Sequence, residues 1–96
     1  MGGMPPELGY LDSMTADVEE LYRRLWTFFR FNGVYNATGL PAITLPLHES
    51  RAGLPIGMMF GTRFGEESLL FQLAGQLERA APWAGRHPPV SIWAEA

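Results

Sequence analysis

The sequence predicts an α+β fold in which two antiparallel strands pack with two amphipathic helices. Three patterns lead to this prediction. Apolar residues recur at helical spacing between residues 15 and 31, and again over Glu66–Ala80. Between these helices, Ala42–Leu47 and Ile56–Thr62 alternate in the manner of strands. Two such runs joined by a polar loop are typical of an antiparallel hairpin.

The first helix is expected to begin at Thr15, whose hydroxyl can cap the free backbone N–H groups of the first turn. Acidic residues follow and arginines lie further on, an order that complements the helix dipole. Glu20 and Arg24 are also spaced i,i+4 in the favourable orientation. We expect the helix to end near Phe31, before Asn32. Its apolar face consists of Val18, Leu21, Tyr22, Leu25, Phe28 and Phe29, with Trp26 beside it.

The hairpin is predicted from turn residues and alternation. A turn is expected over Asn36–Pro41, ahead of the first strand. Pro46 lies near the end of that strand, since a residue without an N–H belongs at an edge or an end. Gly53 is the expected positive-φ residue of the loop His48–Pro55. Alternation gives each strand one face, made of Ile43, Leu45 and Leu47 or of Ile56, Met58 and Phe60.

The second helix is predicted over Glu66–Ala80 because its leucines and alanines repeat at i, i+3, i+4 and i+7. Pro82 closes this helix, and Trp83 and Trp93 are candidate anchors for the tail. The chain is thus expected to have three parts: an extended lead-in over 1–14, a helix–hairpin–helix core over 15–82 and a C-terminal tail over 83–96.

The predicted sheet looks incomplete. Both faces of the strand Ile56–Thr62 are apolar or glycine, which is typical of strands inside a larger sheet. A single hairpin is only marginally stable in water. The composition agrees, because 47% of the residues are apolar and 12% aromatic in a chain of only 96 residues. We therefore expect part of the apolar surface to meet a partner.

Composition excludes several kinds of function. The net charge is −3, lysine is absent and Arg23-Arg24 is the longest basic run, so a nucleic-acid surface is not expected. Without cysteine there are no disulfides, thiolate nucleophiles or thiolate metal sites. The first ten residues do not resemble a signal peptide, and the longest apolar run, about Leu54–Gly61, is far shorter than the ~20 residues of a membrane helix. We expect a soluble, cytoplasmic protein without a membrane contact.

Several motifs in order resemble the C-terminal portion of amidase-signature hydrolases. The resemblance covers roughly Pro5–Pro89 and includes a Phe-Asn-x-Thr-Gly-x-Pro-Ala segment, a Gly-Leu-Pro-x-Gly turn and a link into a leucine-rich helix. Tyr35 stands where that family usually has Phe, and Thr62 is inserted between a Gly and an Arg that are usually adjacent. The matching positions are Asn36, Thr38, Gly39, Pro41 and Ala42, then Gly53, Leu54, Pro55 and Gly57, then Gly61, Arg63, Phe64, Gly65 and Glu66.

The resemblance implies part of the α/β/α amidase-signature fold, without the active site. In that family a Ser nucleophile, a second Ser and a Lys hydrolyse an amide or ester, and the nucleophile lies upstream in a Gly/Ser-rich signature. Such chemistry needs a base for the Ser proton and donors for the oxyanion. This chain has no lysine and no Gly/Ser-rich run. We therefore assign no catalytic, cofactor-binding or metal-binding residue, and expect no cofactor.

Other polar motifs have simpler interpretations. Asn36-Ala37-Thr38 has the form of a glycosylation sequon, but in a chain without a secretory signal a turn is the simpler interpretation. His48, Glu49 and Ser50 are adjacent on a loop, and a hydrolytic triad needs three side chains that converge in space. A metal site formed by His48, Glu49 and His87 lacks the usual ligand spacing.

Two further features concern helices. Ser68 is interpreted as a first-turn helix residue, since it lacks the Gly-x-Ser-x-Gly frame of a nucleophile elbow. An aromatic cluster is left open between core packing and, by the resemblance, a wall of the acyl pocket. It consists of Trp26, Phe28, Phe29 and Phe31.

Three hypotheses about function follow. The first is a C-terminal fragment of an amidase-like hydrolase, inactive alone, whose apolar sheet surface meets the missing N-terminal amidase portion. The second is a non-catalytic interaction module that forms a homo-oligomer, with an interface above ~1,000 Å². The third is one subunit of a split amidase, with a partner that supplies the Ser and Lys. The substrate cannot be deduced from this sequence.

Overall fold

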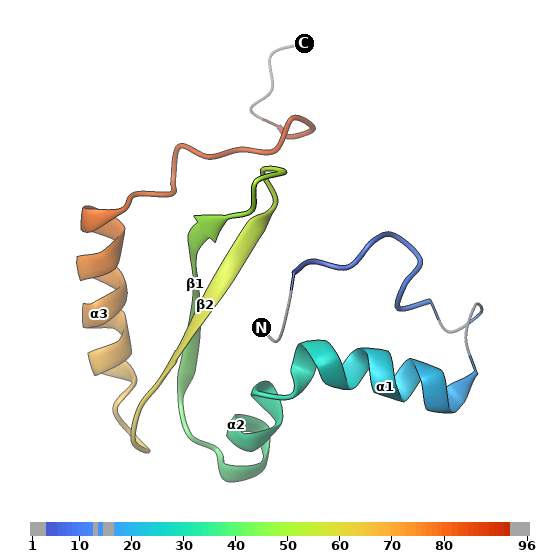
Figure 1. The fold of residues 1–96 in the computed structure, drawn as a ribbon. Coiled ribbons are helices and arrows are strands. Elements are labelled where there is room, and N and C mark those ends of the chain that lie inside the picture. The colour runs from blue at the N-terminus through green and yellow to red at the C-terminus, as the bar shows by residue number, and fades with distance from the viewer. Residues whose placement is uncertain (1–3, 13, 15–16, 93–96) are drawn as a thin grey trace.

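The computed structural model describes residues 4–12, 14 and 17–92 and has the predicted α+β architecture. Three helices and one two-stranded antiparallel sheet follow each other along this part of the chain (Figure 1). The predicted residues Thr15 and Trp93 lie outside the described residues, and the three-part division of the chain stays a prediction. The elements are α1 (Val18–Phe29), α2 (Asn32–Thr38), β1 (Ala42–Glu49), β2 (Pro55–Gly61) and α3 (Glu67–Ala80).

Helix α1 is capped by Asp17. Its carboxylate accepts a hydrogen bond of 2.8 Å from the backbone N–H of Glu20, which satisfies one free donor of the first turn. The helix ends at Phe29, two residues before the predicted end near Phe31. Of the six residues of the predicted apolar face, Phe28 is buried, whereas the other five are half-buried or exposed. The apolar face of α1 is therefore packed against the rest of the chain mainly at Phe28.

The turn predicted over Asn36–Pro41 is wrong for its first half, because residues up to Thr38 belong to α2. Asn32 and Gly33 suggested a break, but helix propensity is a weak preference and the backbone stays near helical angles through Phe31. The chain turns only at Gly39, whose φ of 71° is left-handed and whose N–H donates to the carbonyl of Tyr35 at 2.9 Å. This is a glycine helix cap.

Strands β1 and β2 pair antiparallel, as predicted, from Ala42 opposite Gly61 to Glu49 opposite Pro55. The connecting loop turns at Gly53, and its φ of 81° confirms the predicted left-handed position. In the loop, Ser50 accepts a hydrogen bond from Gly53 through its carbonyl and donates its own N–H to the carbonyl of Leu54. A turn followed by a left-handed glycine is a common three-residue hairpin loop.

One residue of β1 is extra relative to β2. The register shifts between Leu45, which faces Met58, and His48, which faces Ile56. Pro46 lies in this bulge, where a missing N–H costs no ladder hydrogen bond. Because of the extra residue, the side chain that follows Leu45 on the same face of the sheet is that of His48 and not that of Leu47. The prediction that Leu47 shares that face is therefore wrong.

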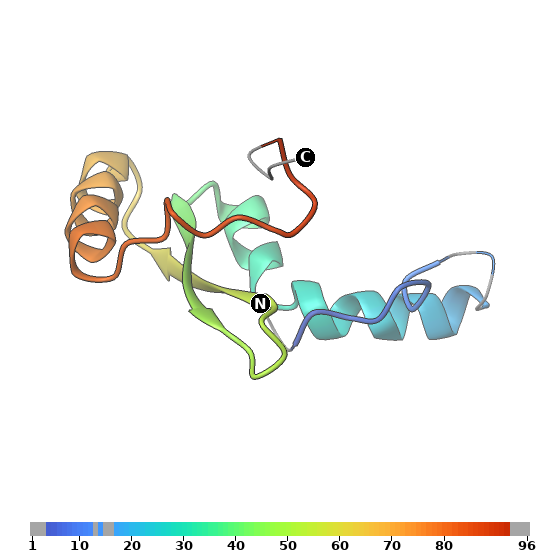
Figure 2. The same ribbon diagram turned by 90° about the horizontal axis from the view of Figure 1, so that it is seen from above.

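Helix α3 begins one residue later than predicted and packs on β1. Leu70 is 5% exposed and Leu45 of β1 is 4% exposed, and these two leucines are the buried centre of this half of the molecule. Figures 1 and 2 both show α3 alongside the hairpin, on the side away from α1 and α2. On the opposite side, Tyr35 of α2 packs against Gly61 of β2. In the described part of the chain, none of the helices has the length and apolar character needed to cross a membrane.

The folded chain is open. Its accessible surface is 7704 Å², whereas a compact monomer of 10.7 kDa exposes about 5,500 Å². The radius of gyration is 16.3 Å, against about 12.5 Å for a compact chain of this length. Among the described residues, the buried hydrophobic side chains are Phe28, Leu45 and Leu70. The chain thus exposes about 2,200 Å² more surface than a compact monomer of the same mass.

Candidate functional site

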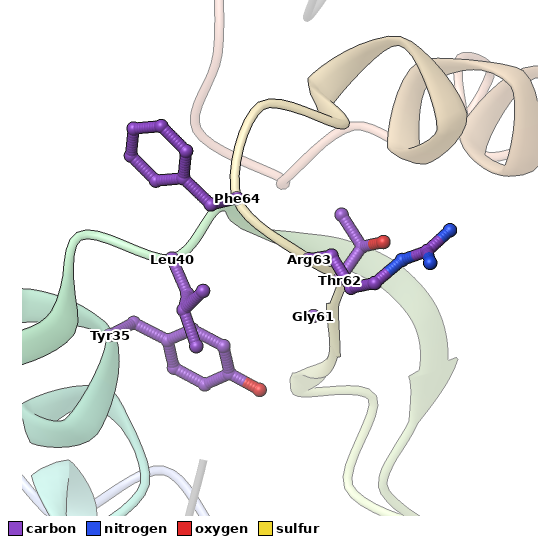
Figure 3. Close-up of a pocket in the computed structure, with 6 residues that line it drawn as sticks. All are labelled: Tyr35, Leu40, Gly61, Thr62, Arg63 and Phe64. Atoms are coloured by element: carbon purple, nitrogen blue, oxygen red, sulfur yellow. The ribbon is translucent and has the colours of Figure 1, made fainter.

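The motif residues of the β2–α3 link line a hollow of about 600 Å³ at one end of the sheet. It lies between the end of α2, the start of β1 and the link that follows β2 (Figure 3). Four of its six lining residues come from the Gly-Thr-Arg-Phe segment that carries the family resemblance. We call this hollow the link site; its residues are Tyr35, Leu40, Gly61, Thr62, Arg63 and Phe64.

The ring of Tyr35 packs directly on the backbone of Gly61. A Cβ atom added at residue 61 would lie 2.6 Å from Cε1 of Tyr35, closer than real Cβ contacts. Gly57 is similarly crowded, since its Cβ would lie 2.6 Å from the Thr44 methyl group. Both glycines leave room for a close neighbour, which is the Tyr35 ring at Gly61 and the Thr44 side chain of the paired strand at Gly57. The groups that approach come from this chain itself.

A polar network fixes the link into α3. Glu66 accepts a hydrogen bond of 3.2 Å from the Thr62 hydroxyl and two from the Arg63 guanidinium, at 2.8 and 3.3 Å. The backbone N–H of Thr62 donates to the Pro41 carbonyl at 3.2 Å. Gly65, with φ of 80°, lets the chain turn into the helix. The inserted Thr62 thus joins the network, and the carboxylate orients a turn instead of activating a nucleophile.

The loop residues once considered for catalysis are engaged in structure. Ser50 accepts a hydrogen bond from the N–H of Leu54 through its hydroxyl oxygen, at 3.1 Å. Glu49 forms an ion pair of 3.0 Å with Arg86. His87 lines the same groove as Glu49 and Arg86, so two members of the disfavoured metal set border one groove. Among the described residues, no group of three or more His, Asp or Glu side chains is arranged to hold a metal ion.

The groove around Arg86 joins the tail to the hairpin and was not predicted. It encloses about 460 Å³, and the half-buried Trp83 lines it, in agreement with the anchor predicted there. The Arg86 guanidinium donates to the Pro46 carbonyl as well as to Glu49. No spacing in the sequence links residues 46, 49 and 86, because their pairing depends on the path of the tail. We call this contact the tail clasp.

The sequon and Ser68 are in helices. The Thr38 hydroxyl donates to the Val34 carbonyl at 2.6 Å, within α2, so Thr38 supports the helix that the turn prediction missed. Ser68 is the second residue of α3, which confirms it as a first-turn residue. Neither residue is paired with a base in the way that a nucleophile requires.

The aromatic cluster does not form one core. Phe28 is buried and meets the ring of Tyr10 edge-on, with centroids 6.1 Å apart and planes at 84°. The rings of Trp26, Phe29 and Phe31 are 68%, 49% and 51% exposed. Core packing therefore describes Phe28 alone.

The lead-in is bound to α1 by an arginine that the sequence analysis treated only as a helix partner. Arg24 lies over the Tyr10 ring, 4.6 Å from its centroid, and donates to the Tyr10 carbonyl at 2.8 Å. Arg24 and Arg23 also donate to Glu20. These hydrogen bonds lower the pKa of Glu20, and the one from Arg23 has the largest effect. The hydrogen bond to the Glu20 carboxylate in turn raises the pKa of Arg23.

Comparison with known proteins identifies the family. The profile of the family described as Amidase matches residues 1–71. A putative amidase AmiC of Mycobacterium tuberculosis is 45% identical over 84 residues, which are 88% of this chain and 17% of that protein. The 6-aminohexanoate-cyclic-dimer hydrolase of Paenarthrobacter ureafaciens is 40% identical over 90 residues, covering 86% of this chain and 18% of that protein.

A solved structure agrees with the sequence matches. The structure of 6-aminohexanoate cyclic dimer hydrolase superposes with a TM-score of 0.76 at 36% identity, over 90% of this chain and 19% of that one. The chain thus spans less than a fifth of the length of these relatives. Its hairpin, its link and its leucine-rich helix have the family's order and shape, and the chain belongs to the amidase family of hydrolases.

Proposed function

We propose that this chain is the C-terminal framework segment of an amidase-like hydrolase and contributes no catalytic residue to it. One observation carries the proposal: the family's motif residues pack and brace the hairpin and its link. Gly61 admits the Tyr35 ring, and Glu66 orients the turn into α3. These are structural tasks, of the kind that hold a site in place from a distance.

The chemistry of the family explains the division of tasks. Amide hydrolysis by a Ser nucleophile needs a base and oxyanion donors within hydrogen-bond reach. In this proposal the Ser–Ser–Lys set comes from the remaining amidase portion, since this sequence contains no lysine. That portion covers the exposed apolar surface of the hairpin and α1. A cytoplasmic location is part of the proposal, and the absence of cysteine, which leaves no disulfide to form in this chain, is compatible with it.

A chimera tests the framework role. In the Paenarthrobacter ureafaciens hydrolase, the 90-residue stretch that matches this chain is replaced by the residues of this chain. We expect the chimera to fold and to hydrolyse 6-aminohexanoate cyclic dimer within about tenfold of the parent rate, a difference of roughly 1.4 kcal/mol in barrier. A matched chimera with Gly61→Leu should lose folded yield, because a leucine side chain collides with Tyr35. A chimera that folds but has no hydrolytic activity contradicts the proposal.

The isolated chain provides the second test. We expect the purified 96-residue protein to release no ammonia from simple amides above a buffer control. Turnover that survives repurification, and that a matched preparation from cells lacking the gene does not show, rejects the framework assignment. Purification of the tagged chain from its own host distinguishes the split-amidase alternative, in which a separate polypeptide with a Gly/Ser-rich signature and the Lys copurifies.

A further inference from the structure

The free edge of β2 has a regular set of unpaired backbone groups. Thr62 donates its N–H to the Pro41 carbonyl at one end of the ladder, and Ser50 donates to Leu54 at the other. In an antiparallel pair, residues alternate between pointing their N–H and C=O groups toward the partner strand and away from it. Alternation counted backward from Thr62 and forward from Leu54 assigns the same direction to each residue of β2. Gly57, Met59 and Gly61 direct these groups away from β1.

The other edge of the sheet is interrupted. β1 has its bulge at Pro46, and the Pro46 carbonyl is occupied by Arg86 in the tail clasp. On β2, by contrast, the proline is at the end of the strand: Pro55 stands at the first position, where its missing N–H faces outward. The edge from residue 57 to residue 61 is therefore continuous and resembles the edges to which further strands add.

This edge is complementary to itself. We propose that β2 pairs antiparallel with β2 of a second copy of the chain, with Met59 opposite Met59 and Gly57 opposite Gly61 of the second copy. In this register the outward N–H and C=O groups of all three residues find partners, since none of them is proline. Two hairpins then join as one four-stranded sheet, which passes the size at which a sheet becomes independently stable.

The side chains fit the same register. Gly57 of the second copy lies beside Gly61, where the Tyr35 ring covers the sheet and leaves no space for a Cβ atom. On the opposite face, Met58 stands across from Phe60 of the second copy. Met58 is 49% exposed in the single chain, and a thioether against an aromatic ring is a favourable contact.

The free surface is large enough for such an interface. The chain as a whole exposes about 2,200 Å² more than a compact monomer, and this excess is larger than the ~800 Å² that each partner contributes to a standard interface. A groove of about 500 Å³ also runs beside β2, between residues 57–60 and the junction of α1 and α2. Phe31 and Val34 line it and are 51% and 54% exposed. The inference concerns the 96-residue chain by itself. In the proposed function the remaining amidase portion covers the same hairpin surface, so this dimer forms only where that portion is absent.

Proline variants on the two edges give a matched test. Thr44 and Met59 face each other across the ladder, and both direct their N–H groups away from their partner strand. Met59→Pro removes a donor from the β2 edge, and Thr44→Pro removes the equivalent donor from the β1 edge. By sedimentation equilibrium we expect twice the 10.7 kDa chain mass for the unmodified protein and for Thr44→Pro, and at least a tenfold weaker association for Met59→Pro.

Amide hydrogen exchange of the unmodified protein keeps the test valid if a variant fails to fold. Protection of the amides of Gly57, Met59 and Gly61 should rise with protein concentration, whereas that of Ile56 and Met58, which bond within the hairpin, should stay constant. A chain that remains a monomer at millimolar concentration overturns the inference, and leaves the edge to a strand of the larger amidase. Equal weakening by both proline variants, or protection that does not change with concentration, overturns it as well.

Discussion

The phenol ring of Tyr35 lies over the backbone of Gly61 so closely that a Cβ atom at residue 61 would stand 2.6 Å from Cε1 of the ring. This contact joins α2 to the end of β2, two elements that share little other packing. It also explains why a strand otherwise rich in large apolar residues ends in glycine.

Gly61→Ala should therefore lower the free energy of unfolding by about 1–3 kcal/mol, the usual cost of overpacking. Urea unfolding followed by circular dichroism measures this change. Gly85→Ala is the matched control, because nothing lies within 4 Å of its added Cβ. In the double variant Tyr35→Ala/Gly61→Ala the alanine at 61 should cost almost nothing. An equal cost with and without the ring contradicts the steric explanation.

Gly39→Ala should destabilise the chain by about 1 kcal/mol, because a residue with a Cβ resists the left-handed angle of 71° that caps α2. Helical signal at 222 nm and the urea midpoint should fall together. Gly33→Ala, inside the same helix and with open space around it, should instead be neutral or stabilising. If both substitutions act alike, α2 does not end at Gly39.

Stability should depend on pH through Glu20. Its pKa in the folded state lies below its ordinary value of 4.5, because Arg23 and Arg24 donate to its carboxylate. The contribution is thus present above the unfolded pKa and is lost as the pH falls through the folded pKa. Glu20→Gln should be less stable than the parent at pH 7, and the difference should shrink toward pH 3. Glu19→Gln, which leaves both arginine contacts intact, should show no such convergence in urea midpoints.

The tail clasp should be measurable by a double-mutant cycle. We expect a coupling of about 0.2–1 kcal/mol between Glu49 and Arg86, since both side chains are partly exposed. Arg86→Ala should cost more than Glu49→Gln, because it also frees the Pro46 carbonyl. Chymotrypsin should cut faster at Trp83 in Arg86→Ala. An unchanged cleavage rate would show that the tail is held by other contacts.

Neighbouring positions in α3 separate buried from exposed packing. Leu70→Ala should cost about 2–3 kcal/mol, because Leu70 is buried against β1. Phe71→Ala should change the unfolding free energy by no more than about 0.5 kcal/mol, since Phe71 is 71% exposed. Similar losses for both variants, by urea unfolding, would mean that Phe71 is covered in solution. Such a result would indicate that a partner covers the face of α3 that carries Phe71.

Local patterns predicted the parts of the fold that depend on local physics. The leucine repeat placed α3 to within one residue, and Gly53 was identified because a loop of this kind needs a left-handed residue. Helix α2 was missed because Asn32 and Gly33 are poor helix formers, and their low propensity was outweighed by continuation of the backbone from α1.

Contacts between distant residues were beyond prediction. Arg24 meets Tyr10, and Arg86 meets Glu49, only because the lead-in and the tail fold back on the elements beside them. The bulge at Pro46 also escaped prediction, since one extra residue leaves the sequence alternation intact while the register moves. The motif residues were recognised from their resemblance to amidase sequences. The hydrogen bond by which Thr62 and Glu66 brace the link, however, could be seen only in the structure.

The hairpin has a kinetic consequence. Its most distant paired residues are Ala42 and Gly61, so the whole ladder closes within one short piece of chain. Hairpins of this kind form in about 1–10 μs, far faster than sheets that join distant segments. On a ribosome, β1 and β2 can therefore be in register as soon as Gly61 has left the exit tunnel. Until another strand pairs with this edge, Gly57, Met59 and Gly61 form a stretch at which a nascent chain is exposed to aggregation.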